Sequence, residues 1–312
     1  MILATILAAQ LFVTNERAGT VQVIDTTTDR VVASTKIHDR PRGLAISPDG
    51  KRVYVAVSWW RDGKRARTGK ERIAALDTRT LKLLRDYTAG TDPECVAVGP
   101  DGQRLYLSNE DAGTASIIDV ASGKHLSTLV VGTEPEGVTA TPDGKWVYVT
   151  AETSNVLSVI DVKAQKTAAN ILVDPRPRAV IFTRDSKYAW ATAEIGGTVM
   201  LVDTAKRRVV KRIRLRAQDK PVGLVLSPDE KRLYVATGRG NGVAVLDTRT
   251  HKVLANIPTG ERVWGIAIAP DGKKVYAANS LSNTVSVIDT ATNRVTKVVK
   301  TDDGPWGLAV GD

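Results

Sequence analysis

Apolar and polar residues alternate with a period of two along most of this chain, in runs of five or six residues separated by short polar loops. Residues 134–161 (EPEGVTATPDGKWVYVTAETSNVLSVID) show the pattern: a loop, an apolar run, a Pro-Asp-Gly turn, a second run, another loop and a third run. Because successive side chains of a strand point to opposite faces, each run predicts a β-strand. Small and β-branched residues dominate the runs, which favours crowded sheets, and helix is expected to be almost absent.

The three-strand pattern occurs seven times, with one copy divided between the two ends of the chain. Each copy closes its third strand with an aspartate, and successive aspartates are 52, 42, 42, 42, 44 and 42 residues apart. These residues are Asp25, Asp77, Asp119, Asp161, Asp203, Asp247 and Asp289. A period near 42 residues that consists only of strands is typical of a β-propeller, so we expect an all-β fold.

A more polar fourth strand follows the third in each copy, as in residues 208–213. Four strands in each of seven copies predict a seven-bladed β-propeller with four antiparallel strands per blade, occupying residues 1–312 as a single domain. The last copy holds only its first strand, residues 305–310, so its other three strands must come from residues 11–37. N-terminal strands that join the C-terminal strand in one blade would close the ring and remove its exposed sheet edges.

Tight turns are predicted where Pro-Asp-Gly separates the first strand from the second, at residues 48–50, 100–102, 142–144 and 270–272. Proline presets φ there, and glycine accepts the left-handed conformation. The aspartate that closes each third strand is expected to accept hydrogen bonds from the turn that follows it.

Composition adds charge and excludes an internal disulfide. The chain has 44 Lys and Arg against 34 Asp and Glu, a formal net charge of +10, which favours anionic partners, although most of this charge is expected on the outer strands. The single cysteine, Cys95, is expected to be a small buried residue. Residues 1–10 are apolar but lack basic residues and are too short to span a bilayer, so they fit either the remnant of an export signal or a lead into the first strand.

One face of the disc is expected to carry different side chains at equivalent positions. The first strand starts at a proline loop and the second returns to it, so two rings of residues should surround one mouth of the central channel. The first ring follows each proline, or Val263 in its place: Arg42, Glu94, Glu136, Arg178, Val222, Trp264 and Trp306. The second ring lies four residues after the aromatic residue of the second strand: Glu16, Ser58, Glu110, Glu152, Glu194, Gly238 and Ser280. Since the turns on the opposite face are nearly identical, recognition is expected at this mouth.

Two interpretations of the mouth residues are open. Arg42 and Arg178 could hold an anionic group with forked hydrogen bonds, beside a stacking wall made by Trp264 and Trp306. Alternatively, the charges pair with one another, which for the first ring involves Glu94 and Glu136. The second-ring partners in that case are Glu110, Glu152 and Glu194. These glutamates also raise the question of calcium, which prefers oxygen ligands, but a structural role for them is favoured and no resident cofactor or metal is expected.

A basic insert at residues 59–70 interrupts one copy on the same face. Trp59, Trp60 and Arg61 open it, and four further basic residues follow. Such a segment could bind nucleic acid through stacking and phosphate contacts, or pack against neighbouring blades as a loop. The favoured interpretation is a lid over the channel mouth.

Catalysis is disfavoured by what the mouth contains. The chain has three histidines, and only His38 is expected near the mouth. No zinc spacing, Ser-His-Asp set or activated cysteine can be assembled from the predicted positions.

Several segments resemble the Tyr-Val-Thr-Asn signature of YVTN-type propeller repeats, and this resemblance extends over all seven copies. They include residues 12–15 (FVTN), 148–151 (YVTA) and 276–279 (YAAN), with a following Val-Ile-Asp-Thr at 287–290. The order of the loops, from Arg-Pro-Arg at 40–42 to Gly-Pro-Trp at 304–306, together with residues 194–198 (EIGGT), is similar to the periplasmic propellers associated with PQQ-dependent alcohol catabolism. The chain departs from them in the insert at 59–70 and in lacking a recognisable full-length signal peptide.

The resemblance implies a periplasmic or secreted, monomeric and non-catalytic protein, accessory to PQQ-dependent dehydrogenase systems. We expect it to bind a protein or a small anionic or aromatic ligand at the channel mouth, without membrane insertion. Two alternatives stay open: a lactonase- or lyase-like enzyme at the mouth, working through Glu110, Glu152, Glu194 and Arg178, and nucleic-acid binding through the insert.

Overall fold

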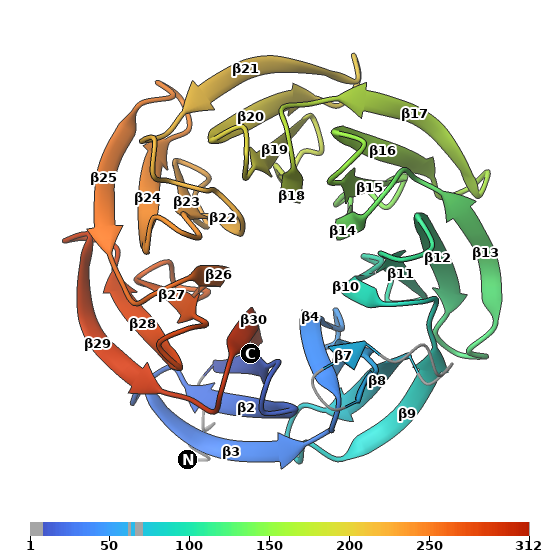
Figure 1. The fold of residues 1–312 in the computed structure, drawn as a ribbon, viewed down its shortest axis with the longest axis horizontal. Helices are drawn as coiled ribbons and strands as arrows, with labels where there is room; N and C mark the ends of the chain where they lie inside the picture. Colours follow the sequence, from blue (N-terminus) through green and yellow to red (C-terminus); the bar gives the residue numbers. More distant parts are fainter. Residues whose placement is uncertain (1–8, 62–63, 66–70, 312) are drawn as a thin grey trace, which may run out of the picture.

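Seven four-stranded antiparallel sheets surround a central axis in the computed structural model, which describes residues 9–61, 64–65 and 71–311. Figure 1 shows them arranged as the blades of a disc. The part of the chain that the structure describes contains no helix, and therefore none that could span a membrane. The predicted fold, a seven-bladed β-propeller, is confirmed.

Four consecutive strands build each of the first six blades, apart from a small hairpin inserted in the first. The first blade contains β4 (Arg40–Ile46), β5 (Arg52–Ser58), β8 (Arg72–Asp77) and β9 (Leu83–Thr88). The second contains β10 (Pro93–Val98), β11 (Arg104–Asn109), β12 (Thr114–Asp119) and β13 (His125–Val130). The third contains β14 (Pro135–Ala140), β15 (Trp146–Ala151), β16 (Val156–Asp161) and β17 (Lys166–Leu172).

The remaining blades repeat this order. The fourth contains β18 (Pro177–Phe182), β19 (Tyr188–Ala193), β20 (Thr198–Asp203) and β21 (Arg208–Arg214). The fifth contains β22 (Leu224–Leu226), β23 (Arg232–Ala236), β24 (Gly242–Asp247) and β25 (Val253–Pro258). The sixth contains β26 (Val263–Ile268), β27 (Lys274–Asn279), β28 (Thr284–Asp289) and β29 (Arg294–Lys300).

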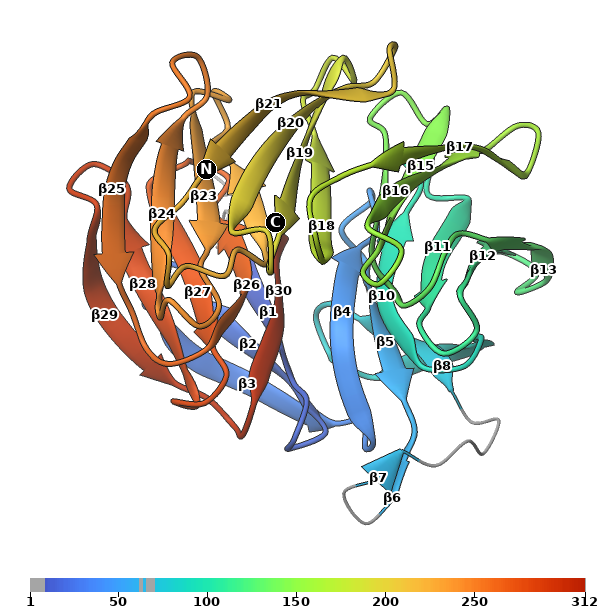
Figure 2. The same ribbon diagram turned by 45° about the horizontal axis from the view of Figure 1, so that its top comes forward.

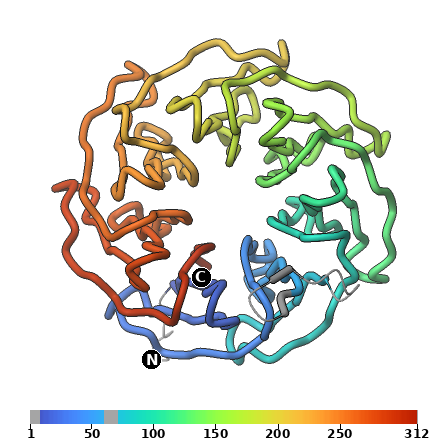
Figure 3. Tube along the Cα trace, in the orientation of Figure 1, coloured from blue at the N-terminus to red at the C-terminus, as the bar shows by residue number. Residues whose placement is uncertain are grey.

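The seventh blade joins the two ends of the chain. Its strands are β30 (Pro305–Gly311), β1 (Gln10–Asn15), β2 (Thr20–Asp25) and β3 (Arg30–Lys36), and β30 pairs antiparallel with β1, with Gly311 opposite Gln10. The Cα trace shows the C-terminal strand β30 in the same blade as the N-terminal strands (Figure 3). The predicted closure of the ring is confirmed.

The predicted turns form as expected. Gly50, Gly102 and Gly144 have φ of 69°, 69° and 70°. In the two copies without this glycine, Ser186 and Glu230 adopt φ of 60° and 57°, so the turn geometry persists with side chains that are less suited to it.

The aspartates that close the third strands fix the next turn. Asp289 Oδ1 accepts hydrogen bonds from the Thr292 amide and hydroxyl, both at 2.7 Å, and this holds the pKa of Asp289 below its usual value.

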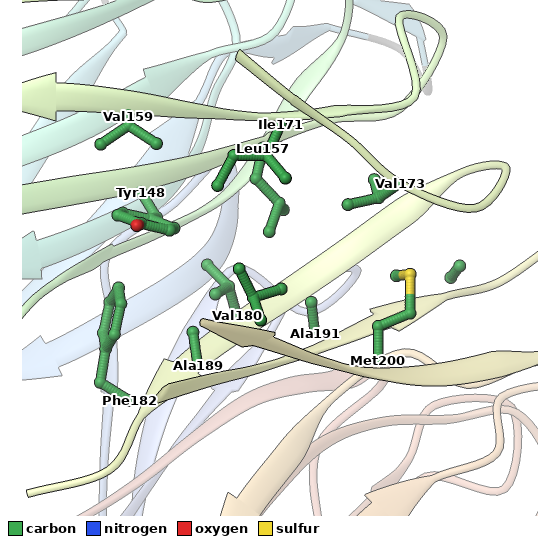
Figure 4. Packing of buried hydrophobic residues seen from close by; sticks show 12 residues of the cluster. Tyr148, Leu157, Val159, Ile171, Val173, Val180, Phe182, Ala189, Ala191 and Met200 are labelled. Atoms are coloured by element: carbon green, nitrogen blue, oxygen red, sulfur yellow. The ribbon is translucent and has the colours of Figure 1, made fainter. Parts of the chain in front are cut away.

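The core lies between blades. Figure 4 shows Tyr148 and Leu157 of the third blade packed toward Val180 and Met200 of the fourth. The ring of Tyr148 meets Phe182 edge to face, with centroids 4.9 Å apart. Because each sheet buries its apolar side chains against the next sheet, no blade could retain this packing alone.

A short hairpin of β6 (Trp60–Arg61) and β7 (Lys64–Arg65) follows β5 and pairs only with itself. In Figure 2 it projects beyond the end of β5, and in Figure 1 it lies over the first blade and not over the centre of the ring.

Candidate functional site

A repeated irregularity in the first strands turns the predicted side chains toward the channel mouth. In five of the seven blades the residue before the proline, or before Val263, takes a left-handed φ, for example 56° at Glu134 and 63° at Arg176. In the blade of Glu134 the strand register then shifts between Pro135 and Val138. Similar shifts follow Pro41, Pro93, Pro177 and Val263. A bulge of this kind redirects side chains that an uninterrupted strand would bury in the blade.

In four of the seven blades a hydroxyl group of the second strand ties the first strand to the next blade. Thr150 Oγ1 accepts the Gly137 amide hydrogen at 2.8 Å and donates to the Arg178 carbonyl at 3.1 Å. Thr14, Ser108 and Thr192 make the equivalent bonds to the carbonyls of Arg42, Glu136 and Val222. The backbone that carries the first ring is therefore tied from blade to blade.

Arg42 lies at the centre of one half of the mouth. Its Nη2 is 2.7 Å from Glu94 Oε2 and 3.2 Å from Glu136 Oε1, and its Nε is 3.9 Å from Glu16 Oε2. The residue is only 6% exposed. Three neighbouring carboxylates therefore engage this guanidinium, and it links blades instead of offering a free fork to a ligand.

Arg178 has the same role in the other half. Its Nη1 lies 3.1 Å from Glu136 Oε1 and also contacts the Glu152 carboxyl group, and its Nε lies 2.7 Å from Glu194 Oε2. Glu136 thus joins Arg42 to Arg178. The interpretation in which the mouth charges pair with one another agrees with these contacts, whereas a free anion clamp made by Arg42 and Arg178 does not.

Arg176 adds a further cation to this half. Its Nε lies 2.7 Å from Glu152 Oε2 and 3.4 Å from Glu194 Oε2. Arg262 Nη2 also approaches Glu194, at 3.5 Å from Oε1. Glu194 is consequently shared by three arginines.

An acidic group lies on the other side of the mouth, at the second blade. Asp92, Glu94 and Glu110 each place one carboxylate oxygen within 4.8 Å of the others. Oxygen ligands of this kind suit calcium, but the Arg40 guanidinium already lies among them, with Nη1 3.2 Å from Glu94 Oε1 and 3.6 Å from Asp92 Oδ1. The structural role predicted for the glutamates fits this arrangement, and the expectation of no resident metal stays a prediction.

Burial separates the pKa values of the mouth carboxyls. It raises the pKa of Glu94 well above its usual value. Burial would also raise the pKa of Glu136, but Arg178 and Arg42 together outweigh it and the pKa is lowered. Burial and the adjacent Glu136 raise the pKa of Glu152 to about 8, so near neutral pH Glu152 is largely protonated and donates its hydrogen bond to Glu136.

The two indoles of the first ring stack on each other. Trp264 and Trp306 have ring centroids 6.1 Å apart and an interplanar angle of 28°. Arg42 Cζ lies 4.4 Å from the Trp306 centroid, while Arg262 Cζ and Arg178 Cζ lie 4.3 Å and 5.1 Å from that of Trp264. The indoles are adjacent as expected, but guanidinium groups already occupy positions over both rings.

Beneath this ion network the central channel is narrow and apolar. It holds a cavity of about 210 Å³, lined mainly by small and branched residues of the first strands: Val96, Val138, Val180, Leu224, Ile266 and Leu308. Cys95 also lines it, and burial raises the pKa of its thiol. Glu136, Arg178, Trp264 and Trp306 line the same cavity, so the network lies between the apolar channel and the mouth.

Of the insert at residues 59–70, the structure describes the side chain of Trp59 and the backbone of residues 60–61 and 64–65. Trp59 is half-buried at the end of β5. The side chains of Trp60 and Arg61 and most of residues 62–70 lie outside the described residues, so the lid and the nucleic-acid interpretations both stay predictions. The backbone of β6 and β7 gives no support to a lid across the channel.

The structure brings ten of the predicted side chains together around one mouth. They are Glu16, Arg42, Glu94, Glu110, Glu136, Glu152, Arg178, Glu194, Trp264 and Trp306. It also reveals a third ring that the sequence reasoning missed, made of the residues before the proline: Arg40, Asp92, Arg176 and Arg262. The sequence did contain a signal for this ring. The residue before the proline varies from loop to loop as much as the residue after it, and it is an arginine in the Arg-Pro-Arg loops of residues 40–42 and 176–178.

Comparison with known proteins agrees with the fold. A family model described as the cytochrome D1 heme domain matches residues 192–306, less than half of the chain. Antigen Lp49 of Leptospira interrogans is 26% identical over 104 residues, which cover 32% of this chain and 23% of that relative. The chain therefore matches only about a quarter of the length of this curated relative.

Solved structures match over most of the chain. A candidate 6-phosphogluconolactonase of Bacteroides fragilis has a TM-score of 0.82 at 22% identity and covers 99% of both chains. Hydrazine synthase of Kuenenia stuttgartiensis has a TM-score of 0.75 at 24% identity and covers 86% of this chain and 88% of its own. A protein of unknown function from Desulfotomaculum acetoxidans has a TM-score of 0.82 at 15% identity, covering 97% and 98%. At these identities the likeness extends to the fold alone.

Proposed function

We propose that the chain is a non-catalytic binding protein that receives a protein or a small anionic or aromatic ligand at its channel mouth. The observation that carries this proposal is the contrast between its two faces. The mouth combines buried ion pairs, stacked indoles and loops that differ from blade to blade, whereas the opposite face carries near-identical turns. A rigid frame with varied side chains suits recognition.

The ion network supports binding over catalysis. The carboxylates of Glu94, Glu136 and Glu194 are all paired with guanidinium groups, so each would have to leave a buried ion pair before acting as a base or nucleophile. A network of this kind positions loops around a ligand more readily than it transfers protons.

We further propose a periplasmic or secreted location and an accessory role in PQQ-dependent dehydrogenase systems. This part rests on the YVTN-like segments and on the order of the proline loops. PQQ, a planar aromatic tricarboxylate, and a soluble PQQ-dependent alcohol dehydrogenase are therefore the first ligands to test.

Calorimetric titration of the full chain with each of the two tests the proposal. We expect one of them to bind, with affinity lost in Trp264→Leu and kept in Trp146→Leu. Trp146 is a matched control, because it is also half-buried under a guanidinium, that of Arg207, but lies at the start of β15 on the opposite face. If neither titrant binds, or if only the Trp146 variant loses binding, the proposal is wrong.

One observation favours a second candidate, a lactonase-like hydrolase. Glu152 has a pKa of about 8 beside Arg178. A carboxyl group that stays protonated at neutral pH can donate its proton to the leaving ring oxygen of a lactone as water adds to the carbonyl, and the resulting carboxylate can take up the proton that the added water releases. The match to candidate 6-phosphogluconolactonases adds a substrate to test, 6-phosphogluconolactone. Hydrolysis that is lost in Glu152→Gln would favour this candidate, and loss in a chelator would add a metal. Turnover equal to the buffer rate would exclude it.

A further inference from the structure

Charge is divided unequally around the mouth. The first and second blades hold Asp92, Glu94 and Glu110 against Arg40 and Arg42. The opposite side reverses this balance, with four arginines: Arg176, Arg178, Arg239 and Arg262. Their nearby carboxylates are Glu194, which three of them share, Glu136, which Arg178 shares with Arg42, and Glu152, which is largely protonated near neutral pH. The side formed by the fourth to sixth blades therefore carries excess positive charge.

An open groove lies on this basic side. It has a volume of about 520 Å³, within the range of small-ligand sites, and extends from the β23–β24 loop to the β1–β2 loop. The residues that matter for charge are Arg17, Arg239, Arg262, Glu16 and Glu261, with Trp264 beneath Arg262.

Two of the three groove arginines have donors to spare. Arg239 is exposed and forms no ion pair with any residue that the structure describes. Arg262 is partly buried: its Nη1 is enclosed by the protein and has no hydrogen-bond partner among the described residues, and its ion pair with Glu194 is long, at 3.5 Å. Arg17, in contrast, donates to Asp303, to Asn283 and to the Ser280 carbonyl.

The position of Arg262 is electrostatically unfavourable without an anion. Burial lowers the pKa of Arg262, and Arg239, Arg178 and Arg176 lower it further, which the single carboxylate Glu194 does not offset. The Trp264 ring holds the guanidinium in a fixed place, 4.3 Å from its centroid. A buried, oriented fork with an unused N–H is the arrangement that proteins use to bind planar or tetrahedral oxyanions.

The two acidic groups of the groove do not cancel this charge. Glu16 pairs with Arg40 at 3.3 Å and with Arg42 at 3.9 Å, and burial raises its pKa. Glu261 is exposed and forms no ion pair with the described residues, so it is the one carboxylate that opposes an incoming anion.

We propose that Arg239 and Arg262 form an anion-binding subsite that takes the phosphoryl or carboxylate group of a small organic ligand, placed in the groove beside Trp264. This inference deepens the proposed function and rests on it for the role of the mouth. It names the pair of arginines that binds the charge, which is not the predicted pair Arg42 and Arg178.

Titration calorimetry of the full chain in low-salt buffer tests the subsite with three probes: phenyl phosphate, benzoate and neutral benzyl alcohol. We expect phenyl phosphate or benzoate to bind and benzyl alcohol not to bind. The stronger of the two anions identifies the phosphoryl or the carboxylate source. Binding of neither anion, or equal binding of benzyl alcohol, would overturn the inference.

Variants then locate the charge. Because Arg239 is exposed, the Arg239→Gln variant should fold normally, and it should bind the anion about tenfold more weakly. Arg262→Lys keeps the charge but loses the fork and should also weaken binding. Glu261→Gln should tighten binding about twofold to fivefold, because it removes an opposing charge. Arg249→Gln, an exposed control in a turn distant from the mouth, changes net charge equally and should leave the affinity unchanged.

The outcome separates this inference from the proposed function. If a ligand binds with an affinity that depends on Trp264 but not on Arg239 or Arg262, the mouth is still a binding site and the anion subsite is wrong. If the Arg249 control weakens anion binding as much as Arg239→Gln, the effect is one of overall charge and the subsite is likewise wrong.

Discussion

At the scale of single residues, the proton on Glu152 is one that makes the stability of the mouth depend on pH. Its folded pKa of about 8 lies above the ordinary value of 4.5, so the stability that this proton contributes is complete below about pH 4.5 and is lost as the pH rises through about 8. We expect the melting temperature to fall between about pH 5 and pH 9. Glu152→Gln, which mimics the protonated carboxyl, should flatten that fall, because it removes a pH-dependent loss in the free energy of unfolding on the order of a few kcal/mol. Differential scanning calorimetry across this range measures it.

A matched control uses the same substitution on the same face. Glu261→Gln removes an exposed carboxylate that has no ion pair among the described residues, so its melting temperature should follow the wild-type pH dependence. A wild-type protein that melts at the same temperature throughout, or a Glu152→Gln variant with an unchanged slope, would show that this proton does not contribute.

The residues around the mouth could be predicted, but their pairing could not. Arg42, Arg178 and the glutamates follow from counting along each repeat, because equivalent positions in a ring of copies must lie on one face. Whether a guanidinium is free or neutralised depends on angstrom-scale approach between blades, which counting does not supply. Arg262 was missed for a different reason: it precedes the bulge, and only its left-handed φ of 57° turns it toward Trp264.

At the scale of the strand, close contact between neighbouring first strands leaves no room for a side chain at some positions. A Cβ added to Gly137 would lie 2.5 Å from the Arg178 carbonyl oxygen of the next blade, and that backbone is held by Thr150. We expect Gly137→Ala to destabilise the fold by about 2 kcal/mol or more through overpacking. Denaturant unfolding measures the loss.

The chain offers a control for that substitution. Ala179 occupies the equivalent position in the fourth blade and already carries a Cβ, so Ala179→Gly removes a methyl group where Gly137→Ala adds one. It should cost only about 1 kcal/mol, from lost packing and from the added freedom of glycine. Equal effects of the two substitutions would show that the blades can move apart to accommodate a methyl group.

Strand positions were the most predictable feature, and the exceptions have local causes. Period-two alternation locates the strands in every blade, and Pro-Asp-Gly turns mark the first hairpin in four of them, because both signals depend on the chain alone. The shortening of β22 to Leu224–Leu226 was not visible in the sequence. The residues before it still bond to the end of β23 and the following loop, as the Lys220 amide does to the Thr237 carbonyl at 2.9 Å, but outside the regular ladder of the two strands. The β6–β7 hairpin has too few residues to give an alternation signal.

At the scale of the whole molecule, one strand pairing closes the disc. Because each sheet buries its apolar side chains against its neighbours, opening the ring exposes the faces of two blades and the edge of β1 at once. Deleting residues 305–312 removes β30, and we expect the shortened chain to lose its single cooperative unfolding transition and to aggregate.

A circular permutant tests the cause, since Gly311 lies opposite Gln10 and a short linker can join them. New ends placed in the turn at residues 142–144 would interrupt one surface hairpin while keeping the closure. The permutant should therefore unfold cooperatively, near the wild-type temperature, in calorimetry. If the permutant also loses cooperative unfolding and aggregates, the ring is stabilised by the order of the strands along the chain and the pairing of β30 with β1 is not the cause.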